Sequence, residues 1–147
     1  MSLIPEELAR DLEDLARLDH RHDLLWLDRL NLWDARHDLP PSRTLDLVAL
    51  WISRGFDGDR LSFEVADALI NELYAAVVVT DHMRYHGLRS VTHLNRPPKR
   101  SLPADGEEPL WWRVYLAFDA GEFRRLPDKD PVEAHTRPLI RQLLADI

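Results

Sequence analysis

Hydrophobic residues recur three or four positions apart along most of this chain, which is the spacing of one face of an α-helix. The first run of this kind covers residues 5–39 and falters around residues 19–23, so we predict a helix that is kinked or broken there. Pro5 is tolerated in a first helical turn, and Pro40 and Pro41 end the run because proline disfavours helical conformation in the residue before it. The apolar positions that define the run are Leu8, Leu12, Leu15, Leu18, Leu25, Trp26, Leu30 and Trp33.

Two further helices are predicted in the middle of the chain. Ser42 or Thr44 can cap the first of them, and Gly55 is a natural C-terminal stop. The second begins at Ser62 and ends at Gly87, with an apolar stripe at helical spacing between these two residues.

The C-terminal part begins with a proline-rich loop, about residues 88–109, which is longer than most connections between helices. Residues 110–118 carry aromatic and β-branched side chains that suit a strand, but the chain offers no convincing partner strand, so we predict a helix. Asp130 provides the N-cap of a last helix, which Pro138 should kink or restart. We therefore predict an all-α fold, a single-domain bundle of five or six helices over residues 1–147 with one long basic loop.

Composition narrows the classes of protein to consider. A chain of 147 residues and 17.2 kDa, 45% hydrophobic and 31% charged, has the size and balance of one folded domain. The sequence has no cysteine, which excludes disulfides, thiolate metal sites and cysteine nucleophiles, and fits a reducing compartment. It shows neither a secretory leader pattern nor 18 consecutive uncharged apolar residues, so we expect a cytoplasmic protein with no membrane partner.

Charge is distributed unevenly along the chain. The formal net charge is −7, yet residues 83–104 carry five basic groups and no carboxylate. This basic loop could pair with the protein's own carboxylates, contact a protein partner or bind nucleic acid, although an acidic body disfavours the last. Its cations are Arg84, Arg89, Arg96, Lys99 and Arg100.

No catalytic motif is recognisable. The five glycines are scattered, so the phosphate-binding patterns of P-loops and dinucleotide folds are absent, as is G-x-S-x-G. His82 and His86 are four residues apart and share a helical face, which is compatible with a transition-metal site or with two helix-end groups. A metal site would need further ligands. The candidates are His22 and His37, and the aspartates three residues before them, Asp19 and Asp34.

The acidic N-terminal segment is the predicted contact face for a partner. Residues 1–40 hold ten carboxylates and five arginines, and a basic partner would be steered toward them. Trp111 and Trp112 are adjacent and must point in different directions, so we expect one of them to be exposed and available for a contact. The carboxylates selected as contact residues are Asp11, Glu13, Asp14, Asp28 and Asp34.

The C-terminal third resembles small bacterial immunity proteins of polymorphic toxin systems. The similarity lies in residues 110–123, in Asp130-Pro131-Val132-Glu133 and in residues 136–140, and residues 62–71 look similar to the central helix of such proteins. The resemblance implies an inhibitor that binds a cognate toxin stoichiometrically, and it supplies no catalytic residue.

Our leading hypothesis is therefore a non-enzymatic module without a cofactor that binds another, basic protein. One alternative is a metal-dependent enzyme in a helical bundle that uses His82 and His86. A second alternative is a nucleic-acid-associated regulator that uses the basic loop. Whether the chain forms a homodimer is left open by the sequence.

Overall fold

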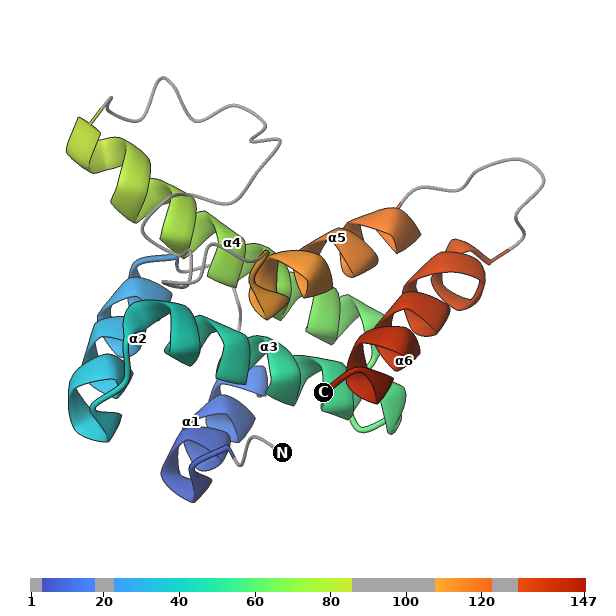
Figure 1. Cartoon of the computed structure of the whole chain (residues 1–147), viewed down its shortest axis with the longest axis horizontal. Coiled ribbons are helices and arrows are strands. Elements are labelled where there is room, and N and C mark those ends of the chain that lie inside the picture. Colours follow the sequence, from blue (N-terminus) through green and yellow to red (C-terminus); the bar gives the residue numbers. More distant parts are fainter. Residues whose placement is uncertain (1–3, 18–22, 86–107, 123–129) are drawn as a thin grey trace.

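Helices make up almost all of the computed structural model, which describes residues 4–17, 23–85, 108–122 and 130–147, with the backbone alone for residues 23–28 and 78–85 (Figure 1). Over these ranges there is no strand, and the elements follow one another as α1 (Glu6–Ala16), α2 (Asp23–His37), α3 (Pro41–Asp57), α4 (Phe63–Tyr85), α5 (Leu110–Glu122), the π-helical turn η3 (Val132–Thr136) and α6 (Arg137–Ala145). The predicted all-α bundle is confirmed. The basic loop falls largely on residues 86–107, outside the described ranges, and the side chain of Arg84 is not described either.

Helix α3 is the central element of the bundle. Of its 17 residues, 11 are buried, which is far more than the single stripe that a surface helix buries. It contacts α2, α4, α5 and α6, and these helices surround it in Figure 1. A cluster of three phenylalanines packs where α3, α4 and α5 meet, with ring centroids 5.2–6.3 Å apart. These rings belong to Phe56, Phe63 and Phe118.

The N-terminal run forms two helices instead of one. Helix α1 ends at Ala16 and α2 begins at Asp23, so the predicted break is confirmed. The leucine stripe of α1 is buried, and the indole Nε1 of Trp33 in α2 donates a hydrogen bond of 2.9 Å to Asp11 in α1. This contact ties the two helices together across the break.

The predicted ends of α3 are wrong. The helix begins at Pro41, which is tolerated at a first helical position, so neither Ser42 nor Thr44 is its cap. It continues past Gly55 to Asp57. Gly55 packs against the following turn, since a Cβ at this position would lie 2.7 Å from Leu61 Cδ1 and the Leu61 side chain would have to shift.

The starts of α4 and α6 are explained by side chains or rings close to them in the sequence. Ser62 Oγ accepts a hydrogen bond of 3.2 Å from the backbone N–H of Val65, which confirms the predicted start of α4. The predicted stop of this helix at Gly87 lies outside the described residues. Residues 110–118 are helical, as predicted, and α5 extends to Glu122. Near the C-terminus the turn before Pro138 is π-helical and α6 restarts at Arg137, which fits the hydrogen bond that a proline cannot donate.

Candidate functional site

Polar groups with strongly shifted pKa values lie between α4 and α5. Asp67 and Asn71 of α4 face Asp119 and Glu122 of α5, and we call these four residues the acidic seam. Residues four apart on α4 and three apart on α5 share a helical face, so each helix presents its pair to the other. Across the seam, Asn71 Nδ2 donates a hydrogen bond of 3.1 Å to Glu122 Oε1.

Asp67 is the most perturbed acid of the seam. Burial raises its pKa to about 7, and the negative charges of Glu122 and Asp119 together with a hydrogen bond to the Glu122 side chain act in the same direction. A hydrogen bond from Asn71 opposes this rise. The Oδ1 atom of Asp67 is shielded from solvent and accepts no hydrogen bond from a described residue. Asp67 therefore keeps a proton to near-neutral pH, and the natural place for that proton is the contact with Glu122.

Aromatic rings continue the same interface away from the carboxyl groups. Tyr74 of α4 and Tyr115 of α5 stack with centroids 4.2 Å apart and planes only 8° from parallel, and Trp112 stacks on Tyr115 at 5.5 Å. Burial raises the pKa of Tyr115 to about 12, and Tyr74 and the nearby carboxylates add to the effect. The phenol thus stays neutral at physiological pH, whereas Asp67 titrates near pH 7.

A carboxyl group with a pKa near 7 can act chemically in two ways. It can be a general acid or base for a bound substrate, or it can make a structural contact depend on pH. Catalysis would require a nucleophile, a metal or a substrate cavity beside it. Within the part of the chain that the structure describes, no three His, Asp or Glu side chains are grouped so that they could hold a metal ion. Through Asp67, the seam can exchange a proton near neutral pH.

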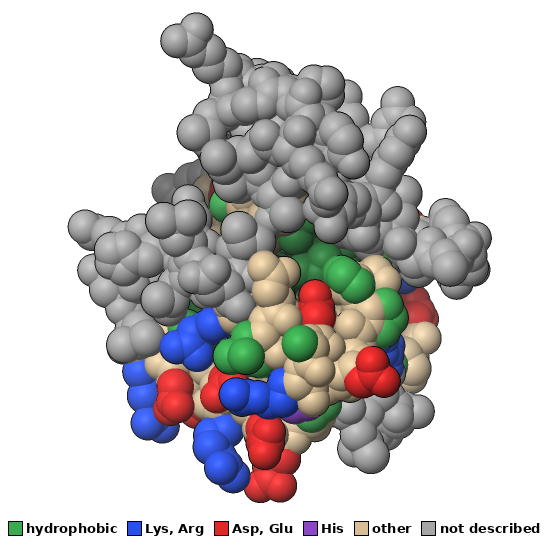
Figure 2. Space-filling view, turned by 90° about the vertical axis from the view of Figure 1, so that its left-hand side faces the viewer, with side chains coloured by type: hydrophobic (Ala, Val, Ile, Leu, Met, Phe, Trp, Pro, Cys, Tyr) green, Lys and Arg blue, Asp and Glu red, His purple; other side chains and the backbone are tan. Residues whose placement is uncertain are grey.

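The predicted N-terminal contact face includes carboxylates that the protein uses internally. Asp11 accepts the Trp33 indole and lies 3.8 Å from Arg36, and Glu13 pairs with Arg60 at 2.9 Å. Asp14 is exposed. Figure 2 shows a face on the α2 side of the molecule, where acidic and basic side chains are interspersed over the described surface. Asp11 and Glu13 are therefore first of all structural residues of α1.

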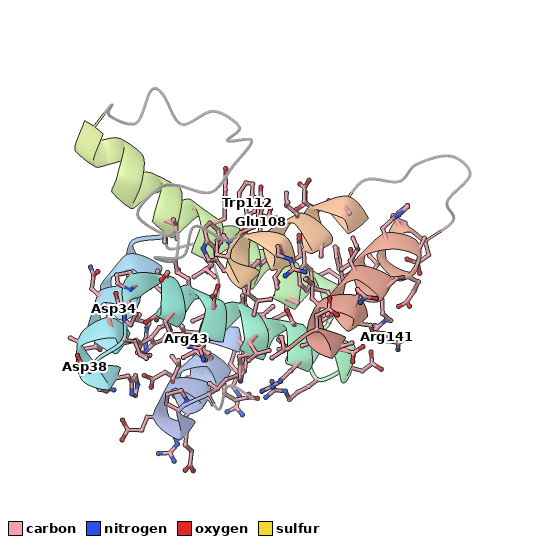
Figure 3. The ribbon with its side chains drawn as sticks, in the orientation of Figure 1. Asp34, Asp38, Arg43, Glu108, Trp112 and Arg141 are labelled. Carbon is pink, nitrogen blue, oxygen red and sulfur yellow. The ribbon has the colours of Figure 1, made fainter. Side chains whose placement is uncertain are left out.

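Asp34 and His37 occupy the end of α2, next to the start of α3 (Figure 3). Both are half-buried, and burial raises the pKa of Asp34 while a hydrogen bond with Thr44 lowers it. His37 Nε2 is shielded from solvent without a hydrogen-bond partner among the described residues. The predicted pair thus shares one helix end, and its polar atoms face inward rather than outward.

Both tryptophans of the predicted contact pair are buried, so the expectation that one is exposed is wrong. Trp111 is 0% and Trp112 is 3% exposed, and their rings meet edge to face at 5.9 Å. The reason is that α5 contacts α3 on one side and α4 on the other, so side chains pointing in different directions both enter the core. Trp112 is labelled in Figure 3, together with Glu108 just before α5.

One important residue was missed by the sequence reasoning. Asp46 in α3 accepts the backbone N–H of Trp111 through Oδ1 at 2.9 Å, although the two residues are 65 positions apart. The carboxylate therefore caps the N-terminus of α5, where exposed N–H groups and the helix dipole favour a negative charge. Burial raises the pKa of Asp46, and its backbone hydrogen bonds and Arg43 oppose the rise. The one available signal was an acidic residue within a run of apolar positions.

The other predicted metal ligands, the contact residue Asp28 and the predicted cations lie outside the described side chains. The ligands are Asp19, His22, His82 and His86, and the cations are the basic-loop residues Arg84, Arg89, Arg96, Lys99 and Arg100. The histidines that the structure does describe are His37 in α2 and His135 in η3.

Across the described ranges, none of the helices has the length and apolar character needed to cross a membrane. Comparison of the chain with protein-family models, with curated proteins and with solved structures gives no significant match.

Proposed function

We propose that this chain is a non-enzymatic cytoplasmic module that inhibits a basic protein by binding it stoichiometrically, in the manner of the bacterial immunity proteins that its sequence resembles. The observation that carries the proposal is the excess of carboxylates, a formal net charge of −7 on a domain of 147 residues. Such a field attracts a basic partner and speeds its association. A toxin that cleaves nucleic acid is a partner of this kind, because its own binding site must attract phosphates.

The structure refines which carboxylates could meet the partner. Helix α1 buries Leu8, Leu12 and Leu15 on one side, so its other side faces solvent. Glu7 and Asp14 are exposed there, whereas Asp11 and Glu13 are engaged with the protein's own Trp33 and Arg60. We therefore place the contact on the exposed side of α1 and assign Asp11 and Glu13 to holding that helix in position.

The test is isolation of the partner from the native host with a tagged chain. We expect a basic polypeptide in 1:1 ratio whose retention weakens as salt is raised. The Glu7→Gln, Asp14→Asn double variant should retain less of it. The matched control is Glu64→Gln, Glu108→Gln, which removes the same charge from exposed sites on α4 and before α5 and should retain as much as the unmodified chain.

Two results would contradict the proposal. One is a polypeptide whose retention is insensitive to salt and equal for both double variants. The other is stoichiometric metal in the purified protein that disappears in the His82→Ala, His86→Ala variant, because this would favour the metal-dependent enzyme.

A further inference from the structure

We propose that the acidic seam is a proton-dependent clasp, in which one proton shared between Asp67 and Glu122 holds α4 and α5 together and its loss above neutral pH loosens them. This device does not depend on the proposed function. It would make the stability of the α4–α5 pair respond to pH in the range that cells experience.

The geometry of the two helices places the clasp at a tight antiparallel contact. Along α4 the facing residues are Asp67, Asn71 and Tyr74, which are spaced as one helical face. Asn71 reaches Glu122, and Tyr74 stacks on Tyr115, which lies about two turns before Glu122 in α5. From Asn71 to Tyr74 the contacts advance along α4, whereas from Glu122 to Tyr115 they go back along α5. The two helices are therefore antiparallel, and Asp67 lies at the Glu122 end of α5, away from the tyrosines.

The groups around Asp67 explain why a proton is needed. The neighbours that act on it are the carboxylates of Glu122 and Asp119 on α5 and the amide of Asn71 on its own helix. None of these is a cation, and none belongs to α2 or α3, which also pack against α4. The single amide donates a hydrogen bond to Glu122 and also hydrogen-bonds to Asp67. Full ionisation would therefore set negative charges against one another in a partly desolvated interface.

A second close contact lies directly beside the clasp and fixes the position of α5. Thr136 Oγ1 donates a hydrogen bond of 2.8 Å to Ala117 O, and the side chain of Thr136 fills the space over Gly121. Gly121 immediately precedes Glu122 in α5. Because this side of α5 is anchored on η3, the backbone at Glu122 stays beside Asp67. The Glu122 side chain is itself exposed and can turn toward solvent, so the cost of deprotonation falls mainly on the half-buried Asp67 and weakens the contact between the two helices.

The direction of the pH effect follows from linkage. The pKa of Asp67 is about 7 in the folded chain against 3.8 for the model carboxyl, so the folded state binds more protons between these values. Stability conferred by the clasp is therefore complete at low pH and is lost as pH rises through about 7. Solvent reaches part of the group and screens the interaction, so we expect the folding equilibrium constant to fall roughly tenfold from this cause instead of the thousandfold that the full shift would give.

The experiment compares urea unfolding of the full chain at pH 5.5 and pH 8.0. Asp67→Asn carries an amide in place of the protonated carboxyl group. Between the two pH values, the folding equilibrium constant of this variant should therefore fall about tenfold less than that of the unmodified chain. Groups that the two proteins share contribute to both profiles and cancel in this difference. Glu64→Gln removes an exposed carboxylate from the same helix and should keep the unmodified profile.

A direct titration keeps the test decisive if Asp67→Asn does not fold. Carbon-detected NMR of the side-chain carboxyl groups of the unmodified chain should show Asp67 titrating between pH 6 and 8. The proposal is overturned if Asp67 titrates below pH 5. It is also overturned if Asp67→Asn keeps the unmodified pH profile, or if Glu64→Gln flattens the profile to the same extent.

Discussion

The substitution Gly121→Ala should destabilise this protein, which is the opposite of what helix propensity predicts. Gly121 is inside α5 and buried against η3. A Cβ built at this position collides with Thr136 Oγ1 and lies 3.2 Å from Thr136 Cβ and 3.3 Å from Phe63 Cε2. Thr136 is itself 0% exposed and hydrogen-bonded to Ala117 O, so it has no free space into which to move.

The expected change in the free energy of unfolding combines one stabilising and two destabilising contributions. Alanine in a helix interior gains about 0.5–1 kcal/mol over glycine. Forcing a methyl group into a packed site costs about 1–3 kcal/mol, and displacing Thr136 loses a hydrogen bond worth about 1 kcal/mol. The net expectation is a decrease of about 1–3 kcal/mol in the free energy of unfolding.

A double-mutant cycle by urea unfolding separates this explanation from a general weakness of α5. In a Thr136→Ala background the colliding hydroxyl is gone, so Gly121→Ala should cost clearly less than in the unmodified chain. Thr136→Ser keeps the hydroxyl and serves as the matched control, in which the full cost should remain. The reasoning is refuted if Gly121→Ala is neutral or stabilising, or if its cost is equal in all three backgrounds.

Three further substitutions test contacts that join distant parts of the chain, each by urea unfolding. Asp46→Ala removes the cap of α5 and should lower the free energy of unfolding by about 1 kcal/mol. Asp46→Asn keeps an acceptor for the Trp111 N–H and should recover most of this loss. Equal losses in the two variants would contradict the capping role. Trp33→Phe leaves Asp11 without its indole donor and should cost about 1–3 kcal/mol, and a loss below 0.5 kcal/mol would argue against this contact as the tie between α1 and α2. Arg137→Met removes the guanidinium that lies 4.4 Å from the centroid of the Phe56 ring and pairs with three carboxylates, and should cost about 1–2 kcal/mol. Arg137→Lys should recover little, since lysine lacks the planar fork, and full recovery would contradict this geometry.

The acidic seam shows where sequence reasoning stopped short. Asn71 lies beside the apolar stripe of α4 in the sequence, and it makes a hydrogen bond across the interface. Asp67 does not stand out in the sequence, since it is one aspartate among 26 acidic residues. Its perturbed pKa depends first on burial and then on Glu122, and both arise only when α5 folds against α4.

The sequence by itself determined the helical class of this protein and several of its boundaries. The α4 cap at Ser62 and the restart near Pro138 both follow from interactions within about one helical turn. Such interactions involve neighbours along the chain, so they can be inferred from the order of residues alone.

The tertiary structure decided which side chains are buried and which charges meet. It placed Leu61 over Gly55, so a glycine that reads as a helix stop lies inside α3. It also buried both tryptophans of α5 and turned Asp46 into the cap of a helix 65 residues away. These outcomes depend on the packing of helices that are distant in sequence, and burial and pairing between them are properties of the assembled bundle rather than of any single segment.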